Sequence, residues 1–273
     1  MIVNARMYSV TPELADLWDS LLRVLVARSG VSAEVFRHAP PTPIDELWER
    51  PDIAAALMCG LPFARTAAPR PVPLAAIVPS PTRYGGKPCY MSDIVVARDG
   101  PLHTVEDVYG KRLGLTVPGS QSGCYAGLEF LGGAARFSGI VGPLISPRGA
   151  VTAVAEGRAD VAPIDAFALD LMAAHAPALV AGVRVIATTP ARPSPLFVAS
   201  AGTDPGVVAA LRKALVEAHE LNASAELMRT LLVERFADVD EASYAELAQR
   251  ARIMDALPLP VWEGMGASSS LSP

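Results

Sequence analysis

One stretch, residues 112–132, constrains the fold of this chain more than any other. Leu113 to Val117 is a short apolar run of β-compatible residues, and Pro118-Gly119 ends it. Ser120-Gln121-Ser122-Gly123 follows, and beyond it apolar side chains recur at helical spacing. The sequence therefore predicts a strand, a tight turn and a helix.

The predicted turn has the chemistry of an anion-binding loop. The first N–H groups of a helix lack intrahelical partners and carry a partial positive charge, which suits a negatively charged ligand. We therefore expect Ser120, Gln121, Ser122 and Gly123 to hold an oxyanion. In the alternative interpretation, Ser120 or Ser122 simply caps a surface helix.

Composition excludes several classes of partner. Hydrophobic residues make up 51% of the 273 residues and aromatic residues only 6%, which favours an aliphatic α/β core. The net charge is −5 and there is no basic run, so we expect no nucleic-acid partner. No apolar segment reaches the ~18 residues of a membrane span. Cys59, Cys89 and Cys124 lie far apart, so neither a metal site nor a cofactor is expected.

Strand and helix patterns alternate along most of the chain. Extended segments at residues 3–8, 33–38, 52–59 and 72–78 are separated by helical patterns, which predicts a parallel, doubly wound sheet. The last third is expected to be entirely helical, with one helix from Leu227 to Phe236. Gly264 to Pro273 is small and polar, as in a disordered tail.

The alternation predicts two lobes joined by two hinge strands. Extended segments at 90–97 and 184–199 flank a central region, so we assign 1–93 plus 193–273 to one lobe and 94–192 to the other. In such folds ligands bind beyond the carboxyl ends of the strands, and closure is a hinge motion. The following residues are expected at these ends: Tyr8, Gly60, Leu61, Ser120–Ser122, Ser146–Arg148 and Asp165.

Four motifs, which occur along the chain in the order given below, carry a resemblance to a known family. They are Asp52-Ile53-Ala54 with Gly60-Leu61-Pro62-Phe63, Tyr84-Gly85-Gly86 through Arg98, Gly110 through Gly123, and Ala153 through Asp165. Together they resemble the substrate-binding components of phosphonate, phosphate and phosphite ABC uptake systems. The resemblance implies a type 2 periplasmic-binding-protein fold, phosphoryl contacts from Ser120, Gln121 and Ser122, further contacts from Tyr90 and Ser92, and Asp165 facing the other end of the ligand.

The chain departs from the family pattern before its Val-x-x-Gly-x-Ala-Asp helix. Family members usually have Gly-Ser-His there, whereas this chain has Ser146-Pro147-Arg148-Gly149. Arg148 would be a permanent, bidentate cation, which leaves room for a carboxylate or sulfonate ligand. Asp165 could instead cap its helix, and Tyr8, Tyr84 and Tyr90 either line the cleft or pack in the core or hinge.

The predicted function is non-catalytic binding of a small anion, phosphonate- or phosphate-like, in an interlobe cleft that closes on the ligand. An ABC permease would be the partner. No Ser/His/Asp arrangement or Gly-x-Ser-x-Gly elbow supports catalysis. The alternative is an intracellular enzyme or sensor subunit on the same fold. The N-terminus has no signal-peptide pattern, so the location is periplasmic if a leader was removed or lies upstream, and otherwise cytoplasmic.

Overall fold

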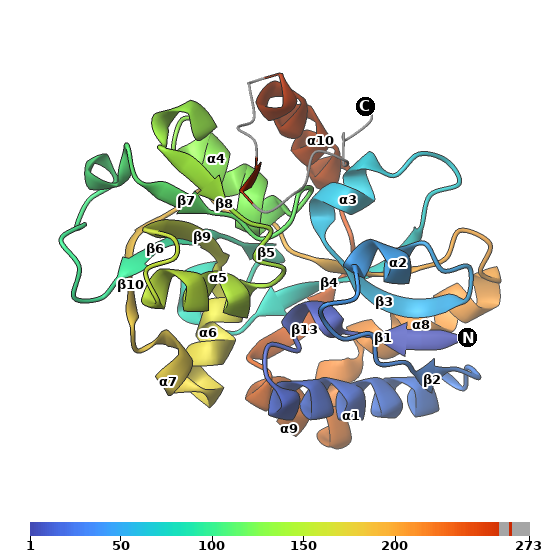
Figure 1. Ribbon diagram of the computed structural model, residues 1–273. Helices are drawn as coiled ribbons and strands as arrows, with labels where there is room; N and C mark the ends of the chain where they lie inside the picture. The colour runs from blue at the N-terminus through green and yellow to red at the C-terminus, as the bar shows by residue number, and fades with distance from the viewer. Residues whose placement is uncertain (257–261, 264–273) are drawn as a thin grey trace. The chain divides into compact units, whose positions relative to one another are not determined.

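The computed structural model describes residues 1–256 and 262–263, and it divides the chain into two compact units. Unit 1 comprises Met1–Tyr90 and Ala191–Ala248, and unit 2 comprises Met91–Pro190 and Gln249–Pro273. Each unit is built on its own six-stranded sheet (Figure 1). The predicted disordered tail, 264–273, lies outside the described residues.

Unit 1 has the strand order β13-β4-β12-β3-β1-β2. Its N-terminal elements are β1 (Ile2–Asn4), η1 (Arg6–Tyr8), α1 (Pro12–Ser29), β2 (Glu34–Val35), α2 (Ile44–Trp48), β3 (Ile53–Met58), α3 (Gly60–Arg65), β4 (Val72–Pro79), η2 (Thr82–Tyr84) and β5 (Cys89–Tyr90). After the return of the chain come β11 (Arg192–Pro193), β12 (Leu196–Ala199), α8 (Pro205–Val216), η6 (Ala218–Glu220), α9 (Asn222–Thr230), β13 (Val233–Ala237) and α10 (Glu241–Asp255).

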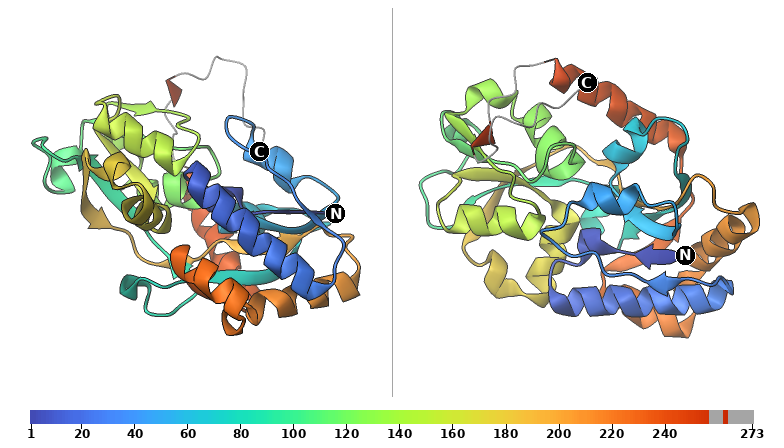
Figure 2. Two further views of the ribbon diagram at one scale, coloured as in Figure 1. Left: turned by 90° about the horizontal axis from the view of Figure 1, so that it is seen from below. Right: turned by 45° about the vertical axis from the view of Figure 1, so that its right-hand side comes forward.

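The first helix illustrates how local sequence sets these bounds. The Thr11 hydroxyl accepts a hydrogen bond from the Leu14 N–H at 3.2 Å, Pro12 occupies the first helical position, and Gly30 ends the helix at φ 68°. Helix α1 packs against α8 and α9, and α8 also contacts β3 and β4 (Figures 1 and 2). Strand β3 is buried throughout, as expected for a strand covered on both faces.

Unit 2 has the strand order β10-β6-β9-β7-β8-β14. Its elements are β6 (Ser92–Ala97), η3 (Glu106–Val108), β7 (Arg112–Gly114), η4 (Gln121–Tyr125), α4 (Ala126–Phe130), η5 (Ala134–Arg136), β8 (Gly139–Val141), α5 (Pro147–Ala155), β9 (Val161–Asp165), α6 (Ala166–His175), α7 (Pro177–Val180), β10 (Val183–Thr188) and β14 (Trp262–Glu263). Helices α4 and α5 lie on opposite faces of this sheet (Figure 1).

The sheets are mixed rather than wholly parallel. Strand β12 is antiparallel to both β3 and β4, between which it lies, and β6 is antiparallel to β9 and β10. Strand β6 follows the passage of the chain into unit 2, and β12 follows its return to unit 1. Each of them runs opposite to the parallel strands of its own sheet. The predicted continuous strand 90–97 is also interrupted at Met91, which separates β5 from β6.

The prediction that the last third is entirely helical is wrong. Helix α9 ends at Thr230, Leu232 has a positive φ of 55°, and Val233–Ala237 forms β13. Strand β13 pairs antiparallel with β4. The hydrogen bonds that this sheet edge offers therefore compete with those that would extend helix α9. The apolar side chains of Val233 and Phe236 are buried in the strand.

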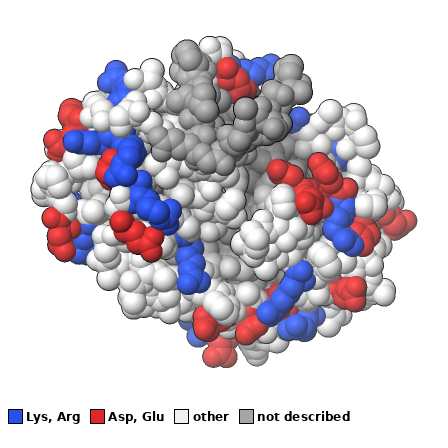
Figure 3. Space-filling model, in the orientation of Figure 1, with Lys and Arg blue, Asp and Glu red and all other residues white. Residues whose placement is uncertain are grey.

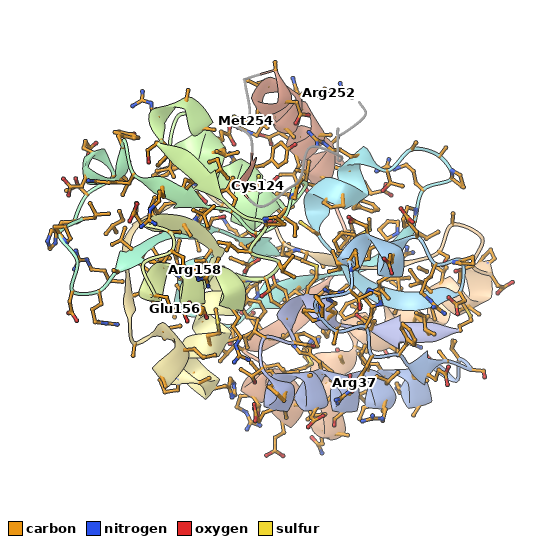
Figure 4. The ribbon with its side chains drawn as sticks, viewed as in Figure 1. Arg37, Cys124, Glu156, Arg158, Arg252 and Met254 are labelled. Atoms are coloured by element: carbon orange, nitrogen blue, oxygen red, sulfur yellow. The ribbon has the colours of Figure 1, made fainter. Side chains whose placement is uncertain are left out.

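The predicted lobe boundaries differ from the two units at the C-terminal end. Residues from Gln249 onward belong to unit 2, not to the N-terminal lobe. The Arg250 guanidinium pairs with the Glu129 carboxylate at 2.6 Å, and Met254 joins a core cluster that includes Cys124 (Figure 4). Both contacts join residues more than a hundred positions apart, so no local pattern in the sequence could indicate them.

The first half of α10 is anchored in unit 1 by Tyr244. Its ring packs edge-on against the Phe63 ring, with 5.5 Å between the ring centroids, and its hydroxyl donates to the Ser194 carbonyl at 2.7 Å. Burial raises the pKa of the Tyr244 hydroxyl, which therefore stays protonated and can act as the donor.

We expect Tyr244→Phe to lower the free energy of unfolding by about 1–3 kcal/mol, because the buried Ser194 carbonyl loses its donor. Chemical denaturation measures this change. Tyr109→Phe is the matched control, since no hydrogen bond of the Tyr109 hydroxyl occurs among the described residues, and its effect should stay within about 0.5 kcal/mol. Equal losses in the two variants would contradict this account.

Candidate functional site

The sheet of unit 2 brings several of the predicted residues to one edge. Strands β7, β8 and β9 are parallel, so their carboxyl ends lie at the same edge. The turn 120–123 follows β7, the turn 146–148 follows β8, and Asp165 ends β9. Ser92 begins the antiparallel strand β6 and pairs directly with Asp165. We call this set of residues the unit-2 edge.

Ser120 caps the helical segment that follows β7, which is one of the two roles expected for it from the sequence. The Ser120 hydroxyl accepts a hydrogen bond from the Gly123 N–H at 3.1 Å. The Tyr125 N–H donates to the Ser120 carbonyl at 3.1 Å, which gives the wide first turn of a π-helix. Because the cap uses an acceptor position of the hydroxyl, the Ser120 proton stays available to another acceptor.

Two main-chain donors in this turn are left without an acceptor. Among residues 1–256 and 262–263, nothing accepts from the N–H of Gln121 or Ser122, which are the first two residues of the helical segment. Gln121 is 3% exposed and Ser122 is 7% exposed. An unmet donor in such surroundings costs about 1–3 kcal/mol, so an anion bound here would satisfy both groups.

Ser92 holds the turn 120–123 in place. Its hydroxyl donates to the Ser122 carbonyl at 2.9 Å, and its own N–H donates to the Thr189 hydroxyl at 2.9 Å. Because the Ser92 proton is used by the Ser122 carbonyl, this hydroxyl positions the turn. Its predicted direct contact with a ligand stays a prediction.

Glycines let the helical segment approach the sheet closely. A Cβ at Gly123 would lie 2.1 Å from the Thr116 Oγ1, and a Cβ at Gly127 would lie 2.4 Å from the Pro163 Cβ. The Thr116 hydroxyl is buried and has no hydrogen-bond partner within the described chain. The sequence analysis did not single out Thr116. Gly123 and Gly127, four positions apart on one face of the helical segment, could have indicated that this face packs closely against its neighbours.

The turn after β8 borders the turn after β7. The Ile145 N–H donates to the Thr116 carbonyl at 3.2 Å, and the Ser146 hydroxyl caps α5 by accepting from the Gly149 N–H at 3.1 Å. Arg148 is exposed and makes no hydrogen bond or ion pair with any described residue. Its guanidinium is therefore available to bind an anion, and the ligand contact expected of it stays a prediction.

Asp165 caps helix α6. One of its carboxylate oxygens accepts from the N–H groups of Phe167 and Ala168, at 3.0 and 3.1 Å, and the side chain is buried. The capping role that the sequence allowed is therefore present. The predicted second role, contact with the far end of a ligand, stays a prediction.

The other predicted residues belong to unit 1, so the unit-2 edge does not include them. Tyr8 follows β1, and Gly60 and Leu61 follow β3, which is parallel to β1. Tyr84 and Tyr90 lie in the excursion after β4. The three tyrosines are 1%, 2% and 2% exposed, which accords with the core-packing alternative for them.

Helix α10 covers the turn after β3. A Cβ at Gly60 would lie 3.0 Å from the Leu247 side chain and 3.1 Å from the Tyr244 ring, so glycine is needed there for close packing. Leu61 is fully buried beside it. We call the carboxyl ends of β1 and β3, with residues 5–9 and 60–61, the unit-1 edge.

The unit-1 edge also holds a cation that the sequence analysis did not single out. Arg6 is half-buried, and its Nη1 atom is buried without a partner among the described residues. Burial lowers the pKa of the guanidinium, and the negative charge of Asp45 opposes that change. A lone arginine after a short strand has no pattern by which sequence reasoning could have recognised it.

Three further observations concern surface charge, metal binding and membrane crossing. Acidic side chains are interspersed among the basic ones on the face in Figure 3. Within the described part of the chain, no group of three or more His, Cys, Asp or Glu residues could hold a metal ion. None of the described helices combines the length and apolar character that a bilayer crossing requires.

Comparison with known proteins bears on this architecture. A family model described as the periplasmic substrate-binding protein of phosphonate ABC transporters matches residues 9–244. A search among curated proteins found no matching sequence.

Solved structures share the fold at low sequence identity. A binding protein component of an ABC phosphonate transporter from Pseudomonas aeruginosa is 17% identical, with a TM-score of 0.78 over 93% of this chain and 86% of that one. PhnD1 from Prochlorococcus marinus, solved with methylphosphonate, is 14% identical, with a TM-score of 0.77 over 94% and 98%. The alkanesulfonate-binding protein SsuA from Xanthomonas axonopodis pv. citri, bound to MOPS, is 18% identical, with a TM-score of 0.60 over 95% and 94%. The fold is therefore the two-lobed type 2 periplasmic-binding-protein fold.

We expect Gly123→Ala to destabilise the protein by about 1–3 kcal/mol, because the new methyl group would overlap the Thr116 side chain. Gly202→Ala is the matched control, since a Cβ at Gly202 meets no atom within 4 Å. Thermal and chemical unfolding of both variants measure the difference. A Gly123→Ala protein as stable as the Gly202→Ala protein would show that the turn does not pack as described.

Proposed function

Because this chain belongs to the family of periplasmic substrate-binding proteins of phosphonate ABC transporters, we propose that it binds a small phosphonate- or phosphate-like anion as the solute-binding component of an ABC uptake system. The observation that carries the proposal is the pair of unmet N–H donors at Gln121 and Ser122, flanked by the hydroxyls of Ser120 and Ser122. A tetrahedral oxyanion accepts from several such donors at once.

The energetics favour a ligand enclosed by both lobes. Charge-assisted hydrogen bonds contribute about 1.5–3 kcal/mol each, so four or five give roughly 6–15 kcal/mol. Association and ordering cost about 4–15 kcal/mol, whereas micromolar affinity needs about −8 kcal/mol. The turn alone falls short over much of this range. Closure of the second lobe on the ligand, which excludes water, would supply the remainder.

Ligand chemistry is proposed at the level of an oxyanion. PhnD1 was solved with methylphosphonate and SsuA with MOPS, so related folds hold different anionic head groups. Arg148 is exposed and unpaired within the described chain, and its planar guanidinium can bind a phosphonate, sulfonate or carboxylate in a bidentate manner. The place of action for this role is the periplasm, and the partner is an ABC permease.

We propose binding without catalysis because the family is a substrate-binding component of a transporter. In the described chain, neither Ser120 nor Ser122 is hydrogen-bonded to a histidine, and Ser120 receives a main-chain N–H instead. An activated serine nucleophile needs an adjacent base. Turnover of a bound ligand would favour an enzyme on the same fold instead.

We expect Ser120→Ala combined with Ser122→Ala to abolish the rise in melting temperature that phosphate or methylphosphonate produces in the wild type, because two hydroxyl donors are lost. The control is Ser20→Ala combined with Ser243→Ala, which removes two exposed hydroxyls bound to carbonyls. Each shift is measured against the same variant without ligand, since loss of the Ser120 cap itself costs about 0.5–2 kcal/mol.

Ser120→Asp separates the two roles of this residue. Aspartate caps helices as well as serine does, so the melting temperature without ligand should be kept, whereas its charge should repel the anion and abolish the shift. An unchanged shift would mean that Ser120 is a cap and nothing more.

We expect Arg148→Ala to weaken binding of the anion at least about tenfold, the loss of one charge-assisted hydrogen bond. Isothermal titration calorimetry with methylphosphonate measures it. Arg158→Ala is the control, because Arg158 is exposed on the same unit and pairs with Glu156 at 3.0 Å (Figure 4). Equal affinities of the Arg148→Ala and Arg158→Ala proteins would remove Arg148 from the site.

A further inference from the structure

The C-terminal half of α10 packs on the helical segment that follows β7. This segment, residues 121–130, consists of η4 and α4 without a break between them. The Tyr125 hydroxyl donates to the Asp255 carboxylate at 2.5 Å, and the Arg250 guanidinium pairs with the Glu129 carboxylate at 2.6 Å. All of these residues belong to unit 2, so the contact lies within one unit.

An apolar contact accompanies the two polar ones. Met254 is buried and joins the core cluster that includes Cys124 and Leu128 (Figure 4). Residues four apart lie on one face of a helix, and this spacing separates Cys124 from Leu128 and Arg250 from Met254. The contact therefore involves one face of each helix, and it combines apolar packing with a hydrogen bond and an ion pair.

Tyr125 connects this contact to the turn 120–123. Its N–H donates to the Ser120 carbonyl at 3.1 Å, which is the bond that closes the π-helical turn. Its hydroxyl donates to Asp255, so α10 restrains the residue whose N–H shapes the turn. A π-helical turn is rare, and a helix as short as 121–130 is marginal in isolation. The conformation of the turn therefore depends on tertiary contacts such as this one.

We infer that Tyr125 and Glu129 are positioning residues for anion binding, because through Asp255 and Arg250 the C-terminal half of α10 holds the turn 120–123 in its binding conformation. The inference rests on the proposed function, in which that turn receives the anion. Neither side chain needs to touch the anion. Because coupling between two places in a protein is reciprocal, the anion strengthens the docking of α10 on the segment by the same factor.

The alternative is that these contacts only stabilise the fold of unit 2. Their loss would then lower the melting temperature of the ligand-free protein and leave the affinity of the folded protein unchanged. If the contacts position the turn, the affinity falls as well. A turn that samples other conformations binds with an affinity reduced in proportion to the fraction that is competent to bind.

The first test is a double-mutant cycle on Tyr125 and Asp255, with methylphosphonate affinity measured by isothermal titration calorimetry well below the melting temperature. We expect Tyr125→Phe and Asp255→Ala each to weaken binding about two- to tenfold, the net effect of losing one hydrogen bond, and the double variant to weaken it no further. Tyr109→Phe is the control within unit 2 and should keep the wild-type affinity.

The second test reverses the ion pair. Arg250→Glu places two carboxylates side by side and should weaken methylphosphonate binding. Arg250→Glu combined with Glu129→Arg restores opposite charges and should recover most of the affinity. Arg252→Glu controls for the change in net charge, since Arg252 lies on the same helix, is exposed and pairs with no described residue (Figure 4).

Hydrogen exchange measures the coupling from the other direction. Saturating methylphosphonate should slow amide exchange in residues 249–255 of the wild type, because the bound anion favours the docked α10. The same saturation should leave exchange in this segment unchanged in the Tyr125→Phe protein. Residues 222–230 of α9, in unit 1, are the internal reference and should respond equally in the two proteins.

The outcomes separate this inference from the proposed function. Weaker binding in both tests, recovery by the charge exchange and loss of the α10 protection support it. A wild type that binds methylphosphonate, with Tyr125→Phe and Arg250→Glu proteins that bind it as their controls do, overturns the inference alone. A wild type that does not bind methylphosphonate, or a Ser120→Ala, Ser122→Ala protein that binds it as the wild type does, contradicts the proposed function and with it the inference.

Discussion

The hydrogen bond from the Ser92 hydroxyl to the Ser122 carbonyl is the interaction on which the candidate site depends. It ties the turn after β7 to the first residue of β6, and Gly123 allows the same turn to contact Thr116 without a side chain between them. These two contacts restrain the turn and favour one arrangement of its N–H groups. The donors of Gln121 and Ser122 are thus fixed before a ligand arrives, so a ligand need not meet the cost of ordering them.

Local features of the site could be predicted from the sequence because they depend on near neighbours in the chain. Ser120, Ser146 and Asp165 each cap the helix that follows, and each precedes its N–H partner by two or three residues. The strand-turn-helix order of residues 112–132 follows from an apolar run, a Pro-Gly break and helical spacing. Its helix begins with a π-helical turn, a detail of hydrogen bonding that apolar spacing does not encode.

Contacts between distant residues could not be predicted in the same way. The pairing of β13 with β4 converts the predicted end of a helix into a strand, because a sheet edge some 150 residues earlier offers hydrogen bonds that outweigh helix propensity. The support of the turn by Ser92 spans 30 positions. Element η1, which Arg6 begins, contacts α1 and β3, so the burial of Arg6 depends on tertiary packing, and a single arginine in the sequence carries no sign of it.

A serine can cap a helix and also donate a hydrogen bond to an anion, whereas an ionised aspartate that caps a helix has no proton to donate. The Ser120 hydroxyl accepts the Gly123 N–H with a lone pair and keeps a proton that an anion can accept. The Asp165 carboxylate has acceptors alone, and an anion near it would raise the electrostatic energy unless the ligand brings a donor. A phosphonate that retains one proton, or one that carries an amine, provides that donor. In the ligand-facing role that the resemblance implies for it, Asp165 would select among oxyanions by their protonation and not by their shape, since a sulfonate carries no proton near neutral pH.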